Sequence, residues 1–179
     1  MATTLDNLQA AFNGESNARA KYMAFAQKAD AEGFGQVASL FRAAAAAETI
    51  HAASHARVIE RTGANAVADI KPAEVKSTAE NLAAAIAGES YERDVMYPDF
   101  IKQATTDADK AAVASFQYAL AAEAEHARMY EEALKDLPNR KGGKRDYWVC
   151  QFCGFTLDQA PTDRCPACHS NKEKFLKVN

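Results

Sequence analysis

The sequence predicts an all-α protein, in which a four-helix bundle is followed by a small C-terminal domain. Three observations support this. Long alanine-rich segments with helical periodicity fill the first three quarters of the 179 residues. A Glu-x-x-His pattern occurs twice, in the second and the fourth of these segments. All four cysteines lie within the last 30 residues. We therefore expect a bundle domain over residues 1–137, a linker over 138–146 and a second domain over 147–179.

The first two helices are expected over about residues 4–32 and 34–62. Gly33 and Gly63 follow them, and glycine commonly ends a helix. The connection over 63–76 lacks a helical period. At about 3.3 Å per residue it reaches roughly 46 Å, close to the roughly 44 Å length of a 29-residue helix. It can therefore be a short excursion or a crossover along the bundle.

The third helix is expected to start at a capping box, Ser77-Thr78-Ala79-Glu80, in which side chains satisfy free amides of the first turn. It should run to about residue 105 with a kink or local break at Pro98, because proline removes one backbone donor. The fourth helix is expected from Asp107 or Asp109 to about 137, where Pro138 stops it. Four helices of this length make a bundle.

Charge and hydropathy exclude several classes of protein. A net charge of −3 argues against a nucleic-acid binder that works through bulk electrostatics. Residues 138–179 carry eight Lys and Arg against four Asp and Glu, a formal +4, which leaves −7 on the preceding part. No N-terminal signal and no run of about 18 apolar residues is visible, so we expect a cytoplasmic protein without a membrane span.

The same metal-ligand module occurs twice in the bundle. A Glu and a His three residues apart lie on one face of a helix, where both can bind one metal ion. In the helix before each pair, a carboxylate stands within a Gly-Glu-Ser sequence. The six residues are Glu15, Glu48, His51, Glu89, Glu123 and His126.

The numbering brings these ligands to one level. In an antiparallel hairpin, residues equally far from the turn lie side by side. Glu15 averages with Glu48 or His51 to a position between 31 and 33, at the glycine turn. Glu89 averages with Glu123 to 106, at the break between the third and fourth helices. Each hairpin therefore collects its own ligands.

Glu92 is a seventh candidate ligand that breaks the symmetry of the repeat. It lies one turn beyond Glu89, where the first repeat has Ala18. With His126 it averages to position 109, again at the break. One interpretation is a solvated glutamate on the helix surface. The functional interpretation is an extra ligand that competes with His51 when the metal changes oxidation state.

Five carboxylates in one bundle interior require positive charge. Burying each as an isolated ion would cost several kcal/mol. Two divalent or trivalent cations would neutralise the cluster, and carboxylate-rich ligation with one imidazole per metal favours iron or manganese. A Glu from each of two helices with Glu-x-x-His from the other two is the arrangement of di-iron carboxylate bundles.

Two tyrosines and several other polar residues accompany the ligands. Tyr22 and Tyr97 follow Glu15 and Glu89 by about two turns, which fits either core packing or hydrogen bonds to ligand carboxylates. His55, one turn after His51, could be a ligand, but no carboxylate is repeated with it, so packing or a supporting position beside the ligands is favoured. The residues assigned to the solvent-exposed surface are His169, Glu125, Glu131 and Glu132.

The C-terminal cysteines have the spacing of a tetrathiolate metal site. Cys150-x-x-Cys153 and Cys165-x-x-Cys168 can form a tetrahedral cage for zinc or iron. Zinc would make it a structural site and iron a one-electron carrier, and spacing leaves both open. A segment of about 33 residues needs such a metal to fold.

Together these motifs resemble the rubrerythrin family over essentially the whole chain. The motifs are Gly14-Glu15-Ser16, Glu48-x-x-His51, Gly88-Glu89-Ser90-Tyr91-Glu92, Glu123-x-x-His126 and the Cys150, Cys153, Cys165 and Cys168 set. The resemblance implies a ferritin-like bundle with a crossover after the second helix and a rubredoxin-like iron domain at the end. It also implies a head-to-tail homodimer, in which one subunit's rubredoxin-like site lies near the other's di-iron site. The opposite charges of the two domains fit such docking.

The resemblance further implies a non-haem di-iron peroxidase that defends against oxidative stress. Hydrogen peroxide would be reduced to water by electrons that pass from rubredoxin or an NAD(P)H-dependent reductase, through the cysteine site, to the irons. In the family, the counterpart of Glu92 exchanges with that of His51 on one iron, and Tyr22 and Tyr97 match tyrosines beside the ligands. These four are the expected catalytic residues.

Two other functions stay open. An iron-oxidising or iron-storage protein would hold many irons per subunit and would not need the cysteine site. An interaction protein on a helical scaffold would hold one zinc and an empty bundle. Metal analysis with a visible spectrum separates them, because a ferric tetrathiolate is red and zinc is silent.

Overall fold

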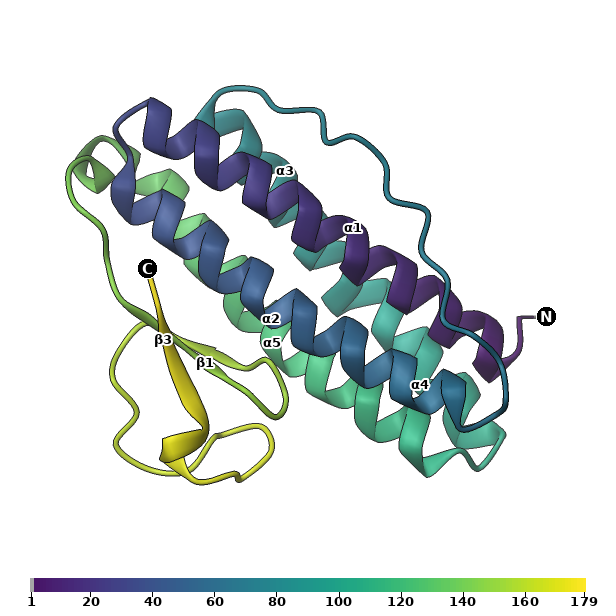
Figure 1. Ribbon diagram of the computed structural model, residues 1–179. Coiled ribbons are helices and arrows are strands. Elements are labelled where there is room, and N and C mark those ends of the chain that lie inside the picture. Colours follow the sequence, from purple (N-terminus) through teal and green to yellow (C-terminus); the bar gives the residue numbers. More distant parts are fainter. Residues whose placement is uncertain (1) are drawn as a thin grey trace.

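A computed structural model describes residues 2–179 and shows a four-helix bundle with a small antiparallel sheet beside it (Figure 1). This confirms the expected fold class. The elements are α1 (Thr4–Ala31), α2 (Gly35–Glu60), α3 (Thr78–Tyr91), α4 (Tyr97–Thr106), α5 (Lys110–Lys135), β1 (Tyr147–Cys150), β2 (Thr156–Leu157) and β3 (Phe175–Val178). None of the helices in this described part has the length and apolar character that crossing a bilayer requires.

The first hairpin consists of two uninterrupted helices, α1 and α2. A capping box between Thr3 and Asp6 starts α1. The turn that follows α1 contains Gly33 in a left-handed conformation, with φ of 79°, which glycine adopts without steric cost. The two helices then pack antiparallel along most of their length.

The second hairpin is interrupted. The capping box at Ser77 and Glu80 starts α3 as expected. The expected kink or local break at Pro98 is confirmed as a break: a π-helical segment over Glu92–Met96 separates α3 from α4, and Pro98 lies in the first turn of α4. Proline has no amide for the carbonyl of Asp94, so the regular hydrogen-bond ladder cannot continue there. The π segment absorbs this break with one wide turn.

The connection between α2 and α3 is a crossover that runs the length of the bundle over α1 (Figure 1). Amide side chains one turn apart on α1 hold it. Gln9 and Asn13 accept hydrogen bonds from the amides of Val67 and Asp69, and Asn17 accepts one from Lys71. Four helical residues rise about 6 Å and two extended residues about 6.6 Å, so the two spacings match.

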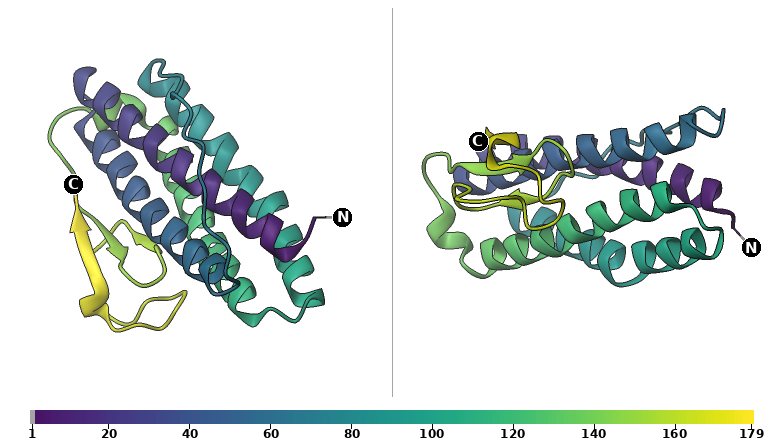
Figure 2. Two further views of the ribbon diagram at one scale, coloured as in Figure 1. Left: turned by 45° about the vertical axis from the view of Figure 1, so that its right-hand side comes forward. Right: turned by 90° about the horizontal axis from the view of Figure 1, so that it is seen from below.

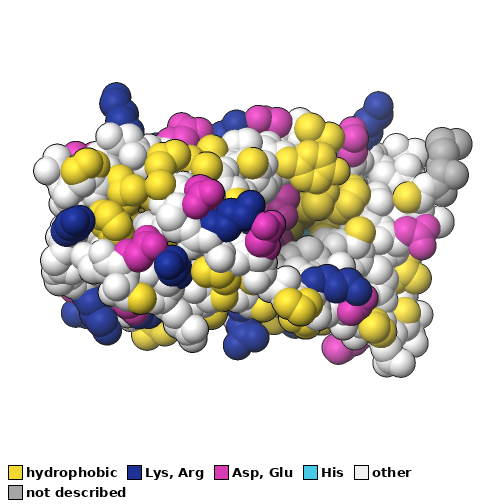
Figure 3. All heavy atoms as spheres, turned by 90° about the horizontal axis from the view of Figure 1, so that it is seen from above, with side chains coloured by type: hydrophobic (Ala, Val, Ile, Leu, Met, Phe, Trp, Pro, Cys, Tyr) yellow, Lys and Arg dark blue, Asp and Glu magenta, His cyan; other side chains and the backbone are white. Residues whose placement is uncertain are grey.

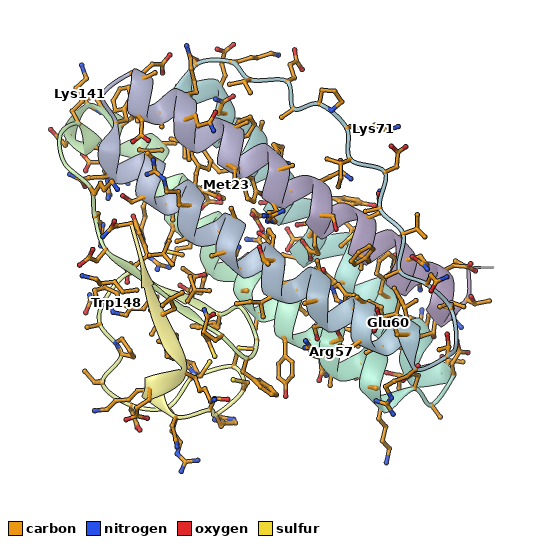
Figure 4. All side chains as sticks on the ribbon, viewed as in Figure 1. Met23, Arg57, Glu60, Lys71, Lys141 and Trp148 are labelled. Carbon is orange, nitrogen blue, oxygen red and sulfur yellow. The ribbon has the colours of Figure 1, made fainter. Side chains whose placement is uncertain are left out.

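Two apolar regions of the core lie on either side of the ligand level. One surrounds Tyr22, Phe41 and Tyr130, and the other surrounds Tyr97 and Phe116. Along every long helix the ligand positions fall between residues of one region and residues of the other. In Figure 4, oxygen and nitrogen atoms gather between the helices near the middle of the bundle. The ligands are therefore enclosed by packed core.

The C-terminal sheet packs against α2 and α5 (Figure 2). Its strand order is β2-β1-β3, with both pairs antiparallel. The segment expected as a linker begins with a short 3₁₀ helix over Leu137–Arg140. It then runs along the bundle: the amide of Gly142 donates to the carbonyl of Gly33 at 3.1 Å, and that of Arg145 donates to the Ser39 hydroxyl at 3.2 Å. These contacts fix the sheet on the bundle.

Candidate metal centres

The bundle brings six of the seven expected ligands into two adjoining clusters. In each cluster one possible ligand atom per residue lies within 4.8 Å of all the others. The first cluster is Glu15, Glu48, His51 and Glu123, and the second cluster is Glu48, Glu89, Glu123 and His126. Glu48 and Glu123 belong to both. A carboxylate has two oxygens, so these two residues can each bridge a pair of ions.

Each histidine presents its Nδ1 to its own cluster, His51 to the first and His126 to the second. Nδ1 of His51 lies 2.8 Å from Glu48 Oε2 and 3.3 Å from Glu123 Oε1. Nδ1 of His126 lies 3.0 Å from Glu123 Oε2, 3.5 Å from Glu48 Oε1 and 3.7 Å from Glu89 Oε2. The three-residue spacing on α2 and α5 creates this arrangement because it sets each Glu and His on one helix face.

Tyr22 and Tyr97 each donate a hydrogen bond to a candidate metal ligand of the opposite hairpin. Tyr22 of the first hairpin donates a hydrogen bond to Glu89 at 2.5 Å, and Tyr97 of the second hairpin donates one to Glu15. Both rings are fully buried. The two hydroxyls therefore orient the two carboxylates that do not bridge the clusters.

The clusters are strongly desolvated. The six side chains are at most 2% exposed. Burial, followed by the charge of Glu123, raises the pKa of Glu89 to about 8. Burial alone would lower the pKa of His51, but the carboxylates of Glu123 and Glu48 raise it to about 10. Burial opposes ionisation of Glu123 as well, yet the two histidines hold its pKa far below its usual range. Without metal, protons must supply the positive charge here.

Three buried carboxylate oxygens without a hydrogen-bond partner in the described part of the chain indicate that the two clusters can bind cations. Glu15 Oε2, Glu89 Oε2 and Glu123 Oε1 have no hydrogen-bond partner within the described residues. Buried polar atoms normally have hydrogen-bond partners, and burying these carboxylates without a metal ion would be costly. Two hard cations ligated by carboxylates and one imidazole each would satisfy all three oxygens. The donor set fits a di-iron centre.

Glu92 stands apart from both clusters. It lies in the π-helical segment and is half-buried, and it is not among the atoms that converge in either cluster. Burial and the charges of Glu89, Glu123 and Glu48 nevertheless raise its pKa well above the usual value, so it lies beside the nest. Its role as a seventh ligand stays a prediction.

A hollow of about 230 Å³ opens next to Glu92, lined by Gly14, Asn17, Ala18, Lys21, Glu92 and the crossover residues Lys71, Pro72, Ala73 and Glu74. We call it the Glu92 hollow. It belongs to the α1 side of the bundle, away from α2 and α5, where the C-terminal sheet packs. On the face seen in Figure 3, acidic and basic side chains lie next to each other near the middle. Figure 4 shows Lys71 pointing outward from the crossover.

His55 belongs to a hydrogen-bond chain that the sequence reasoning did not resolve. Its Nε2 lies 3.2 Å from the Tyr97 hydroxyl and its Nδ1 lies 2.8 Å from the hydroxyl of Ser115. Burial and the neighbouring His51 lower its pKa to about 3, so it is neutral. This confirms the expected supporting position and connects Glu15, through Tyr97, to α5. The signal was present in the sequence as a histidine one turn after His51.

The C-terminal domain covers the other side of the two clusters. Nε2 of His51 donates to the backbone carbonyl of Cys153 at 3.1 Å, and Nε2 of His126 lies 2.9 Å from the hydroxyl of Thr156. Between them, Gly154 has φ of 81°, and a Cβ added to it would overlap the His51 ring. The resemblance implies this position for the domain of a partner subunit, whereas here the chain's own domain occupies it.

The four cysteines form the expected compact group. Sγ of Cys150 lies 3.7 Å from that of Cys168, and Sγ of Cys153 lies 3.6 Å from that of Cys165. Four thiolates about 2.3 Å from a central metal would be about 3.8 Å apart, so these spacings fit a tetrahedral site. Cys168 is half-buried and the other three are buried. The site therefore has one solvent-facing edge.

Two family models match the chain in separate parts. The model described as Rubrerythrin matches residues 6–134, and the model described as Rubrerythrin, rubredoxin-like domain matches residues 148–176. Nigerythrin of Nitratidesulfovibrio vulgaris is 36% identical over 98% of this chain and 86% of its own length. Rubrerythrin of Porphyromonas gingivalis is 35% identical over 98% of this chain and 91% of its own.

Solved structures agree with these matches. Fully reduced, all-ferrous nigerythrin superposes with a TM-score of 0.91 at 35% identity, covering 99% of this chain and 87% of that one. A Chlorobium tepidum ferritin has a TM-score of 0.65 at 24% identity, covering 77% and 87%, which supports the ferritin-like fold alone. The donor sets match the family's iron cofactors, a di-iron pair in the bundle and one iron at the cysteines. This chain is a member of the rubrerythrin family, whose proteins are generally oxidoreductases.

Proposed function

We propose that this protein is a di-iron peroxidase that reduces hydrogen peroxide to water. The observation that carries the proposal is the contact between the two metal sites. Cys153 contributes a thiol to the cysteine group and its backbone carbonyl to the hydrogen bond with His51. One residue thus joins the electron-carrying site to a ligand of the bundle. A storage protein has no use for this connection.

The bound irons would supply two electrons at once, which with two protons convert one H2O2 into two waters. Glu15, Glu48, His51, Glu89, Glu123 and His126 would hold the pair, and Glu92 is the proposed alternative partner to His51. Tyr22 and Tyr97 keep two of these carboxylates in place through their hydroxyls. The packed aromatic core on both sides excludes bulk water from the ligand level.

The Glu92 hollow is the proposed entrance for peroxide. The six clustered residues are at most 2% exposed, and the C-terminal domain covers both histidines. Glu92 is the candidate ligand that is half-buried and also lines a hollow. The small residues Gly14 and Ala18 leave space beside its carboxylate. Peroxide entering there would meet Glu92 first, on the side away from the electron-carrying site.

Electrons are proposed to enter at the half-buried edge of Cys168, from rubredoxin or an NAD(P)H-dependent reductase. The head-to-tail homodimer implied by the resemblance is part of this proposal. In such a dimer, the C-terminal domain of each subunit would make with the other subunit the contacts to His51 and His126 that the chain's own domain makes here.

Anaerobic stopped-flow mixing tests this function. The fully reduced protein is mixed with hydrogen peroxide or with an equal concentration of oxygen, and reoxidation of both sites is followed by absorbance. We expect faster reoxidation by peroxide, with the cysteine site reoxidised after the bundle. Faster reoxidation by oxygen, or uptake of many irons per chain, would instead favour an iron-oxidising protein.

A further inference from the structure

We propose that Thr156 of the C-terminal domain is a positioning residue for His126. The two groups lie 2.9 Å apart, between the Thr156 hydroxyl and His126 Nε2, and both side chains are fully buried. The inference depends on metal binding by the second cluster and is independent of peroxide as the substrate. It assigns to the C-terminal domain a second task beside carrying electrons.

The hydrogen bonds of Thr156 fix the direction of this contact. Its hydroxyl donates to the carbonyl of Gly154 at 3.2 Å, which uses the single hydroxyl proton. The hydroxyl oxygen must then accept from His126 Nε2. Nε2 is accordingly the protonated nitrogen of a metal-binding His126, and Nδ1, which faces Glu123, Glu48 and Glu89, is left for the ion.

The two histidines differ in what holds them. His51 donates to the backbone carbonyl of Cys153, which any residue at that position would supply. His126 depends on a side chain, because an apolar residue in place of Thr156 would leave Nε2–H without an acceptor there. Partners that bind the outer nitrogen of a ligating histidine set its tautomer and ring orientation, and their loss typically lowers metal affinity about 10- to 100-fold. The second cluster is therefore the one that a substitution in the sheet can weaken selectively.

The test compares Thr156→Val with Thr156→Ser in the full chain. Valine has nearly the shape of threonine and keeps the packing, while serine keeps the hydroxyl. Thr162→Val, at an exposed position of the same domain, is the matched control. Ferrous ion binding to the bundle is measured by competition with a chelator, and the cysteine site is read separately from its own absorption.

We expect Thr156→Val to weaken binding of one bundle iron about 10-fold, at the lower end of the range for such partners. Thr156→Ser and Thr162→Val should bind like the unsubstituted protein, with the cysteine absorption unchanged in all three. Equal affinities in Thr156→Val and the unsubstituted protein would overturn the proposal. A loss in Thr156→Ser as large as in Thr156→Val would also overturn it, since packing would then be the cause.

A second measurement separates positioning from loss of docking. In protein with zinc in all sites, nitrogen-15 NMR detects the Nε2 protons of His51 and His126. Thr156→Val should abolish protection of the His126 proton from exchange and leave that of His51 intact. If both protons lose protection together, the domain has left the bundle, and a specific role for Thr156 is refuted.

Discussion

The two hairpins of the bundle carry the same ligand module but differ in regularity. The first, α1 with α2, is built of unbroken helices and has Ala18 one turn after Glu15. The second contains a π-helical segment, and Glu92 lies in it at the position that matches Ala18. Duplication thus provides six enclosed candidate ligands, and one local irregularity provides a fifth carboxylate that remains partly accessible. The symmetric part is suited to holding ions, and the asymmetric part is where we propose that the surroundings of the ions change.

The largest expected effect comes from the residues shared by both clusters. Glu48→Gln in the first hairpin and Glu123→Gln in the second should each lower iron affinity at least about 100-fold, because loss of a neighbour of a ligand already costs 10- to 100-fold. Chelator competition measures this. Equal losses of iron affinity in the two variants would show that the two hairpins contribute equally to iron binding. A large loss in only one variant would show that they do not.

Glu92→Gln tests the asymmetric part. We expect it to retain two bundle irons, since the six clustered ligands remain, and to lose about 10- to 100-fold in peroxide turnover. Glu60→Gln, an exposed position at the end of α2 seen in Figure 4, is the control. Iron content and steady-state turnover are measured together. Full turnover by Glu92→Gln would show that Glu92 does not act as a ligand.

The tyrosine hydroxyls give a smaller effect. Tyr22→Phe and Tyr97→Phe should each lower the free energy of unfolding by about 1–3 kcal/mol, because each leaves a buried carboxyl oxygen without its donor. Tyr97→Phe should cost more, since that hydroxyl also contacts His55. Tyr130→Phe is the control, because the buried Tyr130 hydroxyl has no partner among residues 2–179. Denaturant unfolding measures the free energy of unfolding of each variant. A decrease for Tyr130→Phe equal to that of Tyr22→Phe and Tyr97→Phe would contradict the role of the two hydrogen bonds.

Narrowing the Glu92 hollow should slow the reaction without removing iron. A Cβ at Gly14 would have open space around it, so Gly14→Leu can extend into the hollow. We expect kcat/KM for peroxide to fall about tenfold, equivalent to ~1.4 kcal/mol on the barrier. Gly14→Ala, which should only favour the helix, is the control. Unchanged kcat/KM in Gly14→Leu would place the entrance elsewhere.

The smallest expected effect is that of pH on stability. Each titrating proton changes the free energy of unfolding by no more than ~1.4 kcal/mol per pH unit. In the metal-free protein the folded pKa values of Glu89 and His51, about 8 and about 10, exceed their ordinary values of 4.5 and 6.5. Their contribution to stability is complete below the ordinary values and is lost as pH rises through the folded ones.

His55 has the opposite sign, because its pKa is lowered from 6.5 to about 3: its contribution is complete above pH 6.5 and is lost as pH falls toward 3, so it offsets that of Glu89 below pH 6.5. The melting temperature of the metal-free protein should therefore fall between about pH 6.5 and pH 10 through Glu89 and His51. Iron replaces the protons, and the iron-loaded protein should show a flatter profile. If the melting temperature of the metal-free protein rises over this range, the raised pKa values of Glu89 and His51 are contradicted.

Much of this architecture could be predicted because it repeats along the chain. The ligand spacing and the averaged positions placed Glu15, Glu48 and His51 at one level without a structure, and the second hairpin followed the same rule. The capping box at Ser77 fixed the start of α3 for a local reason. Each of these signals depends on residues within one helix or one hairpin.

What could not be predicted depends on contacts between distant segments. The crossover became certain only from the hydrogen bonds that Asn13 and Asn17 accept from it. Pro98 indicated a kink or break in the third helix but not its π-helical form over Glu92–Met96, since a wide turn leaves no pattern of its own. The bond between Thr156 and His126 spans 30 residues and two domains, and no sequence period connects them.

Anaerobic titration of Fe2+ into protein with an emptied bundle tests the central claim most directly. Two ferrous ions per chain should bind saturably to the bundle at neutral pH, each displacing protons from the nest, while the cysteine absorption stays constant. An absence of saturable binding would contradict the account, and so would uptake without release of protons.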